Sequence, residues 1–419
     1  MNLFKENKKN FKHWDAVSSM IDQSIDIALN HAQSGHPGGS RSKVPLLLST
    51  LLSGVMKWDI RNPGATFGDR FTLIAGHTNP VVYATLAVLN EALRIKYKQT
   101  KNSIYLNPLG DKYTLYYEDL LNLRRKDGLP GHAEMEGKTL FFKFNTGPTG
   151  HGAAPAVGQA FALKYSGANK TKVFALEGEG GLTAGVTHEA RISSYGLKLE
   201  NLIYMIDWND FGIDNRPFSQ IKAGTPKDWF EPYGWKISGT ENGEDWESIL
   251  NAYSELFTGD LQDRPKAIWV KTRKGRGYLK YDSSSHGSPH KRNSIEFERI
   301  SIEIERISPA ARIEVRGVRN SCPTVVMKLS FIRSSSLSRS LAARNSAVVS
   351  SNARDFSSNS WEYSMTCVVS SMIRIRSSVL TTSPLVTVAT MAWADAAPIT
   401  PANCRSANAT NGGGASARG

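Results

Sequence analysis

Residues 173–190 read VFALEGEGGLTAGVTHEA, and this stretch decides the fold of the chain. The apolar run at 173–176 predicts a buried strand, the glycines after it predict a turn, and the pattern at 186–195 predicts a helix. A buried strand that passes through a tight turn into a helix is typical of a parallel sheet with helices packed on it.

The same alternation extends on both sides of this stretch. Strands that alternate with helices indicate an α/β fold, here a mostly parallel sheet covered by helices on both faces. Ligands in such sheets bind at the carboxyl ends of the strands. Apolar periodicity predicts further helices at 14–34, 43–56, 80–97 and 155–165, a turn GHPGG at 35–39, and further strands at 71–75, 202–207 and 267–271.

The turn after the opening strand of this stretch carries Gly178, Glu179 and Gly180. Without side chains, the two glycines let a phosphate approach backbone N–H groups at the start of a helix. A purely structural turn is the alternative, because glycine-rich turns are common. The next predicted strand runs into DWNDFGID, with 28 residues between Gly180 and Asn209. A carboxylate and a carboxamide at neighbouring strand ends can share a magnesium ion, which prefers oxygen ligands.

This pair of strand ends resembles the GDG…N signature of thiamine-diphosphate enzymes. The resemblance implies a thiamine-diphosphate-binding fold, with thiamine diphosphate and Mg²⁺ as cofactors. It also implies that Glu179, Asn209 and the backbone carbonyl of Phe211 hold the metal. Glu179 stands where the family carries aspartate, and octahedral magnesium accommodates the extra methylene poorly unless the turn retreats.

Four further motifs narrow the resemblance to transketolases, and they follow one another in the family's order. A lone histidine is more often structural than catalytic, but four histidines in matching motifs reverse that expectation. The motifs are SGHPGG with His36, DRFTLIAGH with His77, PGH and NTGPTGHG with His132, Gly147, Pro148 and Thr149, and DSSSHGSPH with His286.

By this resemblance the chain is a transketolase-like transferase of the pentose phosphate pathway, which moves a two-carbon ketol unit between sugar phosphates. His36, His132 and His286 would be its catalytic residues. Charge develops on a sugar oxygen and protons move on and off hydroxyl groups near neutral pH, which is work that suits histidine. The residues implied to contact the cofactor are His77, Gly147, Pro148, Thr149, Gly180, Asn209 and His286.

Other residues in these motifs carry no catalytic assignment. We interpret His151, His188 and His290 as structural residues. Glu189 matches a family glutamate at the dimer interface, with an exposed helix charge as the alternative. Ala184 stands where transketolases usually carry another interface glutamate. Its surroundings, LTAG, resemble deoxyxylulose-phosphate synthases, whereas GHPGG, DRF and SHG favour transketolase.

Residue usage changes near residue 292. Residues 1–291 hold 25 Lys, 11 Arg and all nine His, whereas residues 292–419 hold one Lys, 14 Arg, no His and 24 Ser. We therefore divide the chain into a thiamine-diphosphate-binding domain at 1–292 and a non-homologous Ser/Arg-rich segment at 293–419. One interpretation of the segment is an irregular or disordered tail. Because it also holds apolar pieces such as TCVVSSMIRI, our hypothesis is that it is translated out of frame.

The segment after residue 292 does not match the second domain that the resemblance implies. Transketolases form their site between the diphosphate-binding domain of one chain and the pyrimidine-binding domain of another. The second domain brings the glutamate that activates the aminopyrimidine and the arginines that hold the sugar phosphate. We expect this chain alone to lack activity unless a second protein chain supplies those groups, in a homodimer or heteromer. The alternatives are a subunit of a split transketolase and a non-catalytic cofactor-binding protein.

The bulk composition argues against other classes of protein. With 40% hydrophobic and 21% charged residues, the chain is globular in composition. Its net charge of +13 divides into +6 before residue 292 and +7 from there on, without a compact Lys/Arg block, which argues against a nucleic-acid groove. Cys322, Cys367 and Cys404 form neither a disulfide framework nor a metal spacing. No run reaches the ~18 to 20 apolar residues that span a bilayer, so we expect a cytoplasmic protein without a membrane partner.

Overall fold

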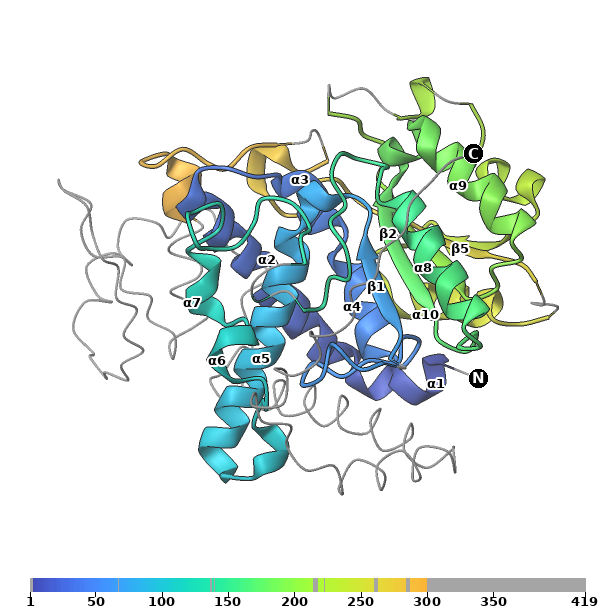
Figure 1. The fold of residues 1–419 in the computed structure, drawn as a ribbon. Helices are drawn as coiled ribbons and strands as arrows, with labels where there is room; N and C mark the ends of the chain where they lie inside the picture. The colour runs from blue at the N-terminus through green and yellow to red at the C-terminus, as the bar shows by residue number, and fades with distance from the viewer. Residues whose placement is uncertain are drawn as a thin grey trace, which may run out of the picture. The chain divides into compact units, whose positions relative to one another are not determined.

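Figure 1 shows the fold of the chain as a computed structural model. Two predictions concern residues that the structure does not describe. They are His286 and the Ser/Arg-rich segment from residue 300 onward. The structure describes residues 3–66, 68–135, 138, 140–213, 218–221, 223–259, 263–283 and 287–299.

A five-stranded sheet lies at the centre of the domain, and all four of its strand pairs are parallel. The strand order β1-β2-β3-β5-β4 places β3 in the middle, between β2 and β5. This confirms the predicted α/β fold with a parallel sheet. The strands are β1 (Arg70–Leu73), β2 (Val173–Gly178), β3 (Leu202–Trp208), β4 (Lys236–Thr240) and β5 (Lys266–Lys271).

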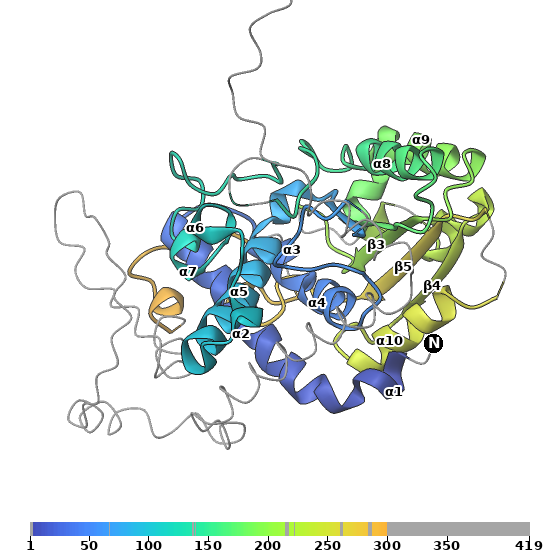
Figure 2. The ribbon, with the colours of Figure 1, turned by 60° about the horizontal axis from the view of Figure 1, so that its bottom comes forward.

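Helices cover both faces of the sheet, as Figure 2 shows. Side chains along each strand alternate between two cores. Phe174 and Leu176 of β2 belong to the core shared with α2, α4, α5 and α10, whereas Val173 and Ala175 belong to the core shared with α8 and α9. These helices are α2 (Phe11–Ala32), α4 (Val44–Leu52), α5 (Pro80–Thr100), α8 (Ala153–Tyr165), α9 (Gly185–Gly196) and α10 (Trp246–Leu256).

None of the helices in the described part of the chain is long and apolar enough to cross a membrane.

Shorter helices connect the longer helices and the strands. The short α-helices are α1 (Leu3–Asn7), α3 (Pro37–Ser42), α6 (Gly110–Tyr113) and α7 (Tyr117–Leu120). The 3-10 helices are η1 (Lys8–Asn10), η2 (Gly76–Thr78), η3 (Ser103–Tyr105), η4 (Glu179–Thr183), η5 (Phe218–Gln220), η6 (Lys227–Trp229), η7 (Glu231–Tyr233) and η8 (Leu279–Tyr281).

The fold differs from the sequence prediction at α3, β4 and α10, and the short helices α1, α6 and α7 were not predicted either. The predicted turn GHPGG is wrong in its second half, because α3 begins at Pro37, whose fixed φ suits the first turn of a helix. The edge strand β4 and the helix α10 were not predicted. β4 reads KISGT, and one aliphatic side chain, Ile237, among polar and glycine residues gives no strand periodicity.

Candidate functional site

Side chains that follow four neighbouring strands lie along one edge of the sheet. Parallel strands end on the same side, so the carboxyl ends of β1, β2, β3 and β5 meet there. His77 follows β1, Glu179 and Gly180 follow β2, Asn209 and Phe211 follow β3, and Lys274 follows β5.

The three predicted metal ligands are in direct contact. The buried Glu179 carboxylate accepts hydrogen bonds from the backbone N–H groups of Asn209 and Phe211, each at 3.2 Å. The side-chain oxygen of Asn209 accepts a further bond from the Phe211 N–H at 3.2 Å. Asp210 between them has a φ of 64°, a left-handed conformation that turns the chain at this point. One carboxylate and one amide oxygen thereby meet at the N–H group of Phe211, the residue whose carbonyl is the third predicted ligand.

This oxygen set fits a hard divalent cation in the type of its donors. Within the described part of the chain, no group of three or more His, Cys, Asp or Glu side chains could hold a metal. The Glu179 set is of another kind, because an amide and a carbonyl stand beside one carboxylate. Burial and the nearby Asp207 carboxylate together raise the pKa of Glu179 to about 7, against an opposing effect of Lys274. A bound cation would favour the charged carboxylate.

Asp207, near the end of β3, is fully buried at this edge and was not predicted as a site residue. Because the amide nitrogen of Asn209 donates to Asp207, its amide oxygen is left for the Phe211 side of the site. A carboxylate ending the apolar run LIYMID was the signal that could have found it. Its donors are Ser42 Oγ at 2.5 Å, Lys43 Nζ at 2.9 Å, Asn209 Nδ2 at 3.1 Å and Thr272 Oγ1.

Lys274 is the second site residue that the sequence analysis missed. Its Nζ donates to the carbonyl of Phe211 at 2.7 Å and to that of Gly212 at 3.4 Å. Burial lowers the pKa of Lys274, and the Glu179 carboxylate opposes that change. The signal that could have found Lys274 is the motif TRKGRG, a basic residue and glycines directly after a strand that ends at the same edge.

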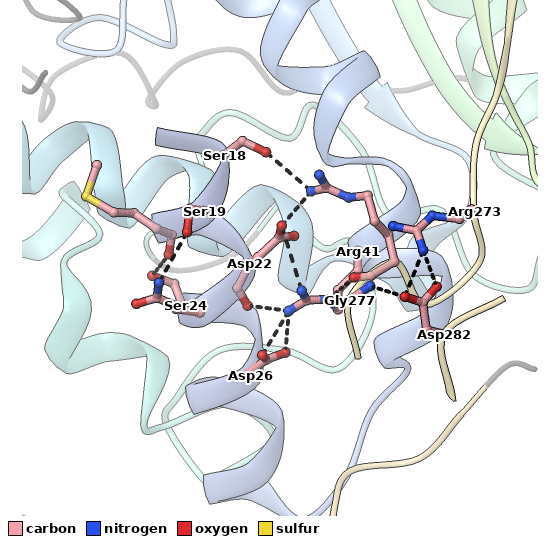
Figure 3. Close-up of polar contacts among 12 residues, drawn as sticks. Ser18, Ser19, Asp22, Ser24, Asp26, Arg41, Arg273, Gly277 and Asp282 are labelled. Atoms are coloured by element: carbon pink, nitrogen blue, oxygen red, sulfur yellow. Dashed lines mark hydrogen bonds and ion pairs between the residues drawn. The ribbon is translucent and has the colours of Figure 1, made fainter. Parts of the chain in front are cut away.

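An ion pair to α2 and a hydrogen bond from α3 hold the loop after β5 in place (Figure 3). Arg41 of α3 pairs with Asp26 of α2 at 2.8 Å and donates to the carbonyl of Arg276 at 2.6 Å. Arg276 pairs in turn with Asp22 at 2.5 Å. Separating buried partners of this kind leaves an uncompensated charge, so the pairs resist movement. The backbone that carries Lys274 is therefore fixed against the strand edge.

Two of the predicted histidines lie together. The rings of His36 and His77 meet edge to face, with centroids 5.1 Å apart. Thr149 Oγ1 lies 3.2 Å from His77 Nδ1. Burial, with smaller contributions from Arg124 and His132, lowers the pKa of His36 to about 4. His36 is therefore neutral at neutral pH and can accept a proton or a hydrogen bond.

The glycines leave open space at the turns. A side-chain carbon at Gly180 or at Gly147 would meet no other atom within 4 Å, and Gly147 has a φ of 60°. Backbone groups there are accessible to a phosphate. Glu177 ties the two turns together, because its carboxylate accepts the N–H of Gly150 at 3.1 Å and that of Gly178 at 2.9 Å.

The remaining predicted residues differ in their exposure to solvent. His132 and Pro148 are exposed, as are Gly147 and Thr149. His290 is buried, and its ring stacks on Tyr278 with centroids 4.2 Å apart, a contact that fits a structural residue. Glu189 is an exposed residue of α9.

Comparison with known proteins identifies relatives of the chain. The family model described as "Transketolase, thiamine diphosphate binding domain" matches residues 15–316. The transketolase of Geobacillus stearothermophilus is 32% identical over 289 residues, which are 65% of this chain and 39% of that protein. The probable transketolase of Schizosaccharomyces pombe is 33% identical over 288 residues, 66% of this chain and 38% of that protein. The chain thus spans about two fifths of the length of the curated relatives it matches.

Solved structures share the fold. A crystal structure of a Pichia stipitis transketolase in complex with sedoheptulose 7-phosphate superposes with a TM-score of 0.56. The superposition covers 69% of this chain and 41% of that chain, at 24% sequence identity. At that identity the likeness shows the fold alone.

Proposed function

The chain belongs to the transketolase family, and on that premise we propose that it is the cofactor-binding half of a transketolase-type enzyme. The proposed reaction transfers a two-carbon ketol unit between sugar phosphates, with thiamine diphosphate and Mg²⁺ as cofactors. The family match describes the thiamine diphosphate-binding domain. The rest of the reaction belongs to the proposed assembly, since the curated relatives are longer than this chain.

The observation that carries the proposal is the contact of Glu179 with Asn209 and Phe211, directly before the open glycine Gly180 in the chain. Three oxygen donors suit a magnesium ion, and the N–H groups of an open glycine turn suit a diphosphate. A purely structural turn has no need of a buried carboxylate whose pKa is raised to about 7. A magnesium diphosphate group therefore explains the arrangement better than a structural turn does.

The histidines would act on the cofactor and the sugar. When bound, thiamine diphosphate supplies the nucleophilic carbon and the electron sink for cleaving and forming carbon–carbon bonds. His77, in contact with Thr149, would orient the cofactor. His36 is neutral at neutral pH and would accept the proton of a sugar hydroxyl, with His132 and His286 as its proposed partners.

A second chain would complete the site. We propose that its pyrimidine-binding domain joins this domain in a cytoplasmic homodimer or heteromer, with the domain boundary of this chain near residue 292. The nucleotide sequence around codon 292 separates two forms of the proposal. A pyrimidine domain encoded in another frame over residues 293–419 favours a frameshift, whereas one in a neighbouring gene favours a split enzyme.

Complementation tests the proposed activity. The full chain is mixed with the pyrimidine-domain portion of the Geobacillus stearothermophilus transketolase, and ketol transfer from sedoheptulose 7-phosphate to an aldose phosphate is followed. We expect transfer from the mixture and none from either part alone. The same mixture with Asn209→Ala is the control and should be inactive. Binding of thiamine diphosphate without transfer in any mixture would favour the rival function, a non-catalytic cofactor-binding protein.

A further inference from the structure

A short helix carries one of the proposed catalytic histidines. His36 directly precedes α3, and Ser40 Oγ of α3 donates to the His36 carbonyl at 2.7 Å. A helix of six residues forms too few internal hydrogen bonds to be stable alone, so contacts with other elements decide where α3 lies. The same contacts therefore decide where His36 lies.

Arg41 of α3 joins this helix to α2 and to the loop after β5 (Figure 3). Its Nη1 donates to both carboxylate oxygens of Asp26 at 2.8 Å and to the carbonyl of Asp22 at 3.1 Å, and both of these residues belong to α2. Its Nε donates to the carbonyl of Arg276 at 2.6 Å. Arg41 is 6% exposed, so these bonds are largely removed from competing water. One guanidinium thus fixes α3 against two other elements.

The chain after β5 also returns to the beginning of α3. A side-chain carbon at Gly287 would lie 3.1 Å from Pro37 Cγ, so Gly287 lies directly against the Pro37 ring. In the chain, Gly287 directly follows the proposed catalytic His286, and Pro37 directly follows His36. The neighbours of two proposed catalytic histidines are therefore in contact, and Arg41 fixes the elements that carry both.

The charges around Arg41 balance one another. Two guanidinium groups, Arg41 and Arg276, face two carboxylates, Asp22 and Asp26. Asp22 pairs with Arg276 at 2.5 Å and lies 3.8 Å from Arg41. Arg41→Lys would keep the charge, but one ammonium does not reproduce the fixed directions in which a guanidinium donates to a carboxylate and a carbonyl together. These contacts require the shape of arginine as well as its charge.

We propose that Arg41 is a positioning residue for the substrate side of the site. It fixes α3 and the loop after β5 as one unit, so that His36 keeps its ring contact with His77 and Pro37 keeps its contact with Gly287. This inference rests on the proposed function, in which the histidines act on the sugar. Arg41 acts through the histidines and not on the cofactor.

Two variants separate position from charge. Arg41→Lys keeps the charge and loses the guanidinium. The double variant Arg41→Met with Asp26→Leu removes both partners of the ion pair, so it keeps the net charge and leaves neither partner buried alone. Arg94→Met is the control, because Arg94 of α5 pairs with Glu91 at 2.5 Å and with Glu118 of α7 at 3.0 Å. Circular dichroism and thermal unfolding establish which variants are folded, and two Arg41 variants keep the test available if one is not.

Nuclear magnetic resonance of the histidine rings in the full chain gives the first readout, with the His36 signal assigned from His36→Gln. Burial lowers the pKa of His36 to about 4, so this ring is neutral in the wild type at about pH 5. We expect it to be mostly protonated at that pH in both Arg41 variants, because a shifted α3 exposes the ring to water. It should stay neutral in Arg94→Met. A ring that stays neutral in either folded Arg41 variant would overturn the inference.

Ketol transfer in the complemented mixture gives the second readout. We expect kcat to fall at least about tenfold in both Arg41 variants, while the dissociation constant of thiamine diphosphate with Mg²⁺ changes less than about twofold. The contacts of Glu179 with Asn209 are untouched by these substitutions. An unchanged kcat, or an equal loss of thiamine diphosphate affinity, would overturn a role that acts through the histidines. If the wild-type mixture transfers nothing, the proposed function fails, and the His36 titration still decides whether Arg41 positions α3.

Discussion

Burial of the Glu179 carboxylate lowers the free energy of unfolding of the chain wherever that carboxylate is charged. Its pKa is raised from 4.5 to about 7, so between these values the folded chain holds a proton that the unfolded chain releases. The free energy of unfolding therefore falls as pH rises through this interval. Near pH 8 the free energy of unfolding of Glu179→Gln should exceed that of the wild type by up to about 3 kcal/mol. Near pH 4 the two free energies of unfolding should be the same.

Urea unfolding at both pH values measures this difference. Glu189→Gln is the control, because Glu189 is an exposed residue of α9, and the change there should stay below about 0.5 kcal/mol. A Glu179→Gln variant that is less stable than the wild type near pH 8 would contradict this prediction. It would show that the charged carboxylate stabilises the fold without a bound cation.

For His36 the free energy of unfolding changes with pH in the opposite direction. Its pKa is lowered from 6.5 to about 4, so the unfolded chain takes up a proton in this interval and the folded chain does not. The contribution of His36 to stability is present above pH 6.5 and is lost as pH falls toward 4. We expect the stability of His36→Gln to fall less over this range, by on the order of 1–3 kcal/mol. Parallel pH profiles for the two proteins in urea unfolding would contradict the burial of a neutral imidazole.

The sequence could predict those site residues that lie in ordered motifs. His77, Gly180 and Asn209 belong to such motifs, and each follows a predicted strand, which places it at one edge of a parallel sheet. Asp207 and Lys274 also lie at or after strand ends, but their contacts could not be predicted in this way. Their role depends on which side chains three separate strand ends bring together, and that is decided by the register of the sheet.

In the strand-to-helix turn after β2, the surroundings require glycine at position 181 but not at position 180. A side-chain carbon at Gly181 would lie 2.3 Å from the Glu177 carboxyl group, whereas one at Gly180 would meet nothing within 4 Å. Glu177 cannot retreat without breaking its bonds to Gly150 and Gly178. We expect Gly181→Ala to lower the free energy of unfolding by about 1–3 kcal/mol and Gly180→Ala to lower it by much less.

Chemical denaturation of the two variants compares these glycines directly. The Gly180→Ala variant should instead lose affinity for a diphosphate, because its methyl group fills the open space in front of the turn. Equal destabilisation by the two substitutions would contradict the different surroundings of the two glycines.

Helices and strands with continuous or periodic apolar patterns could be predicted, and β4 and α10 could not. α2, α5, β2 and β3 lie within a few residues of their predicted bounds, because each buries a periodic or continuous apolar surface. β4 is defined by its pairing with β5 and by the packing of α10 behind it. Contacts between distant segments of this kind leave no local pattern in the chain.

The chain as a whole combines a confirmed fold with a proposed assembly. The parallel sheet with helices on both faces follows from the strand and helix patterns, and the family match extends over residues 15–316. The predicted boundary near residue 292 stays a prediction, as does the pairing with a pyrimidine-binding domain. Composition shows where residue usage changes, but it carries no information on which partner surface completes a site.

Binding of thiamine diphosphate tests the central claim most directly. Calorimetry of the full chain with Mg²⁺ should show one thiamine diphosphate per chain, and thiamine without its diphosphate should bind at least about tenfold more weakly, because we propose that the strand edge binds the phosphate end. Asn209→Ala should abolish binding while the chain stays folded. A folded wild-type chain that binds no thiamine diphosphate, or an Asn209→Ala variant that binds it equally well, would contradict the assignment of this edge as the cofactor site.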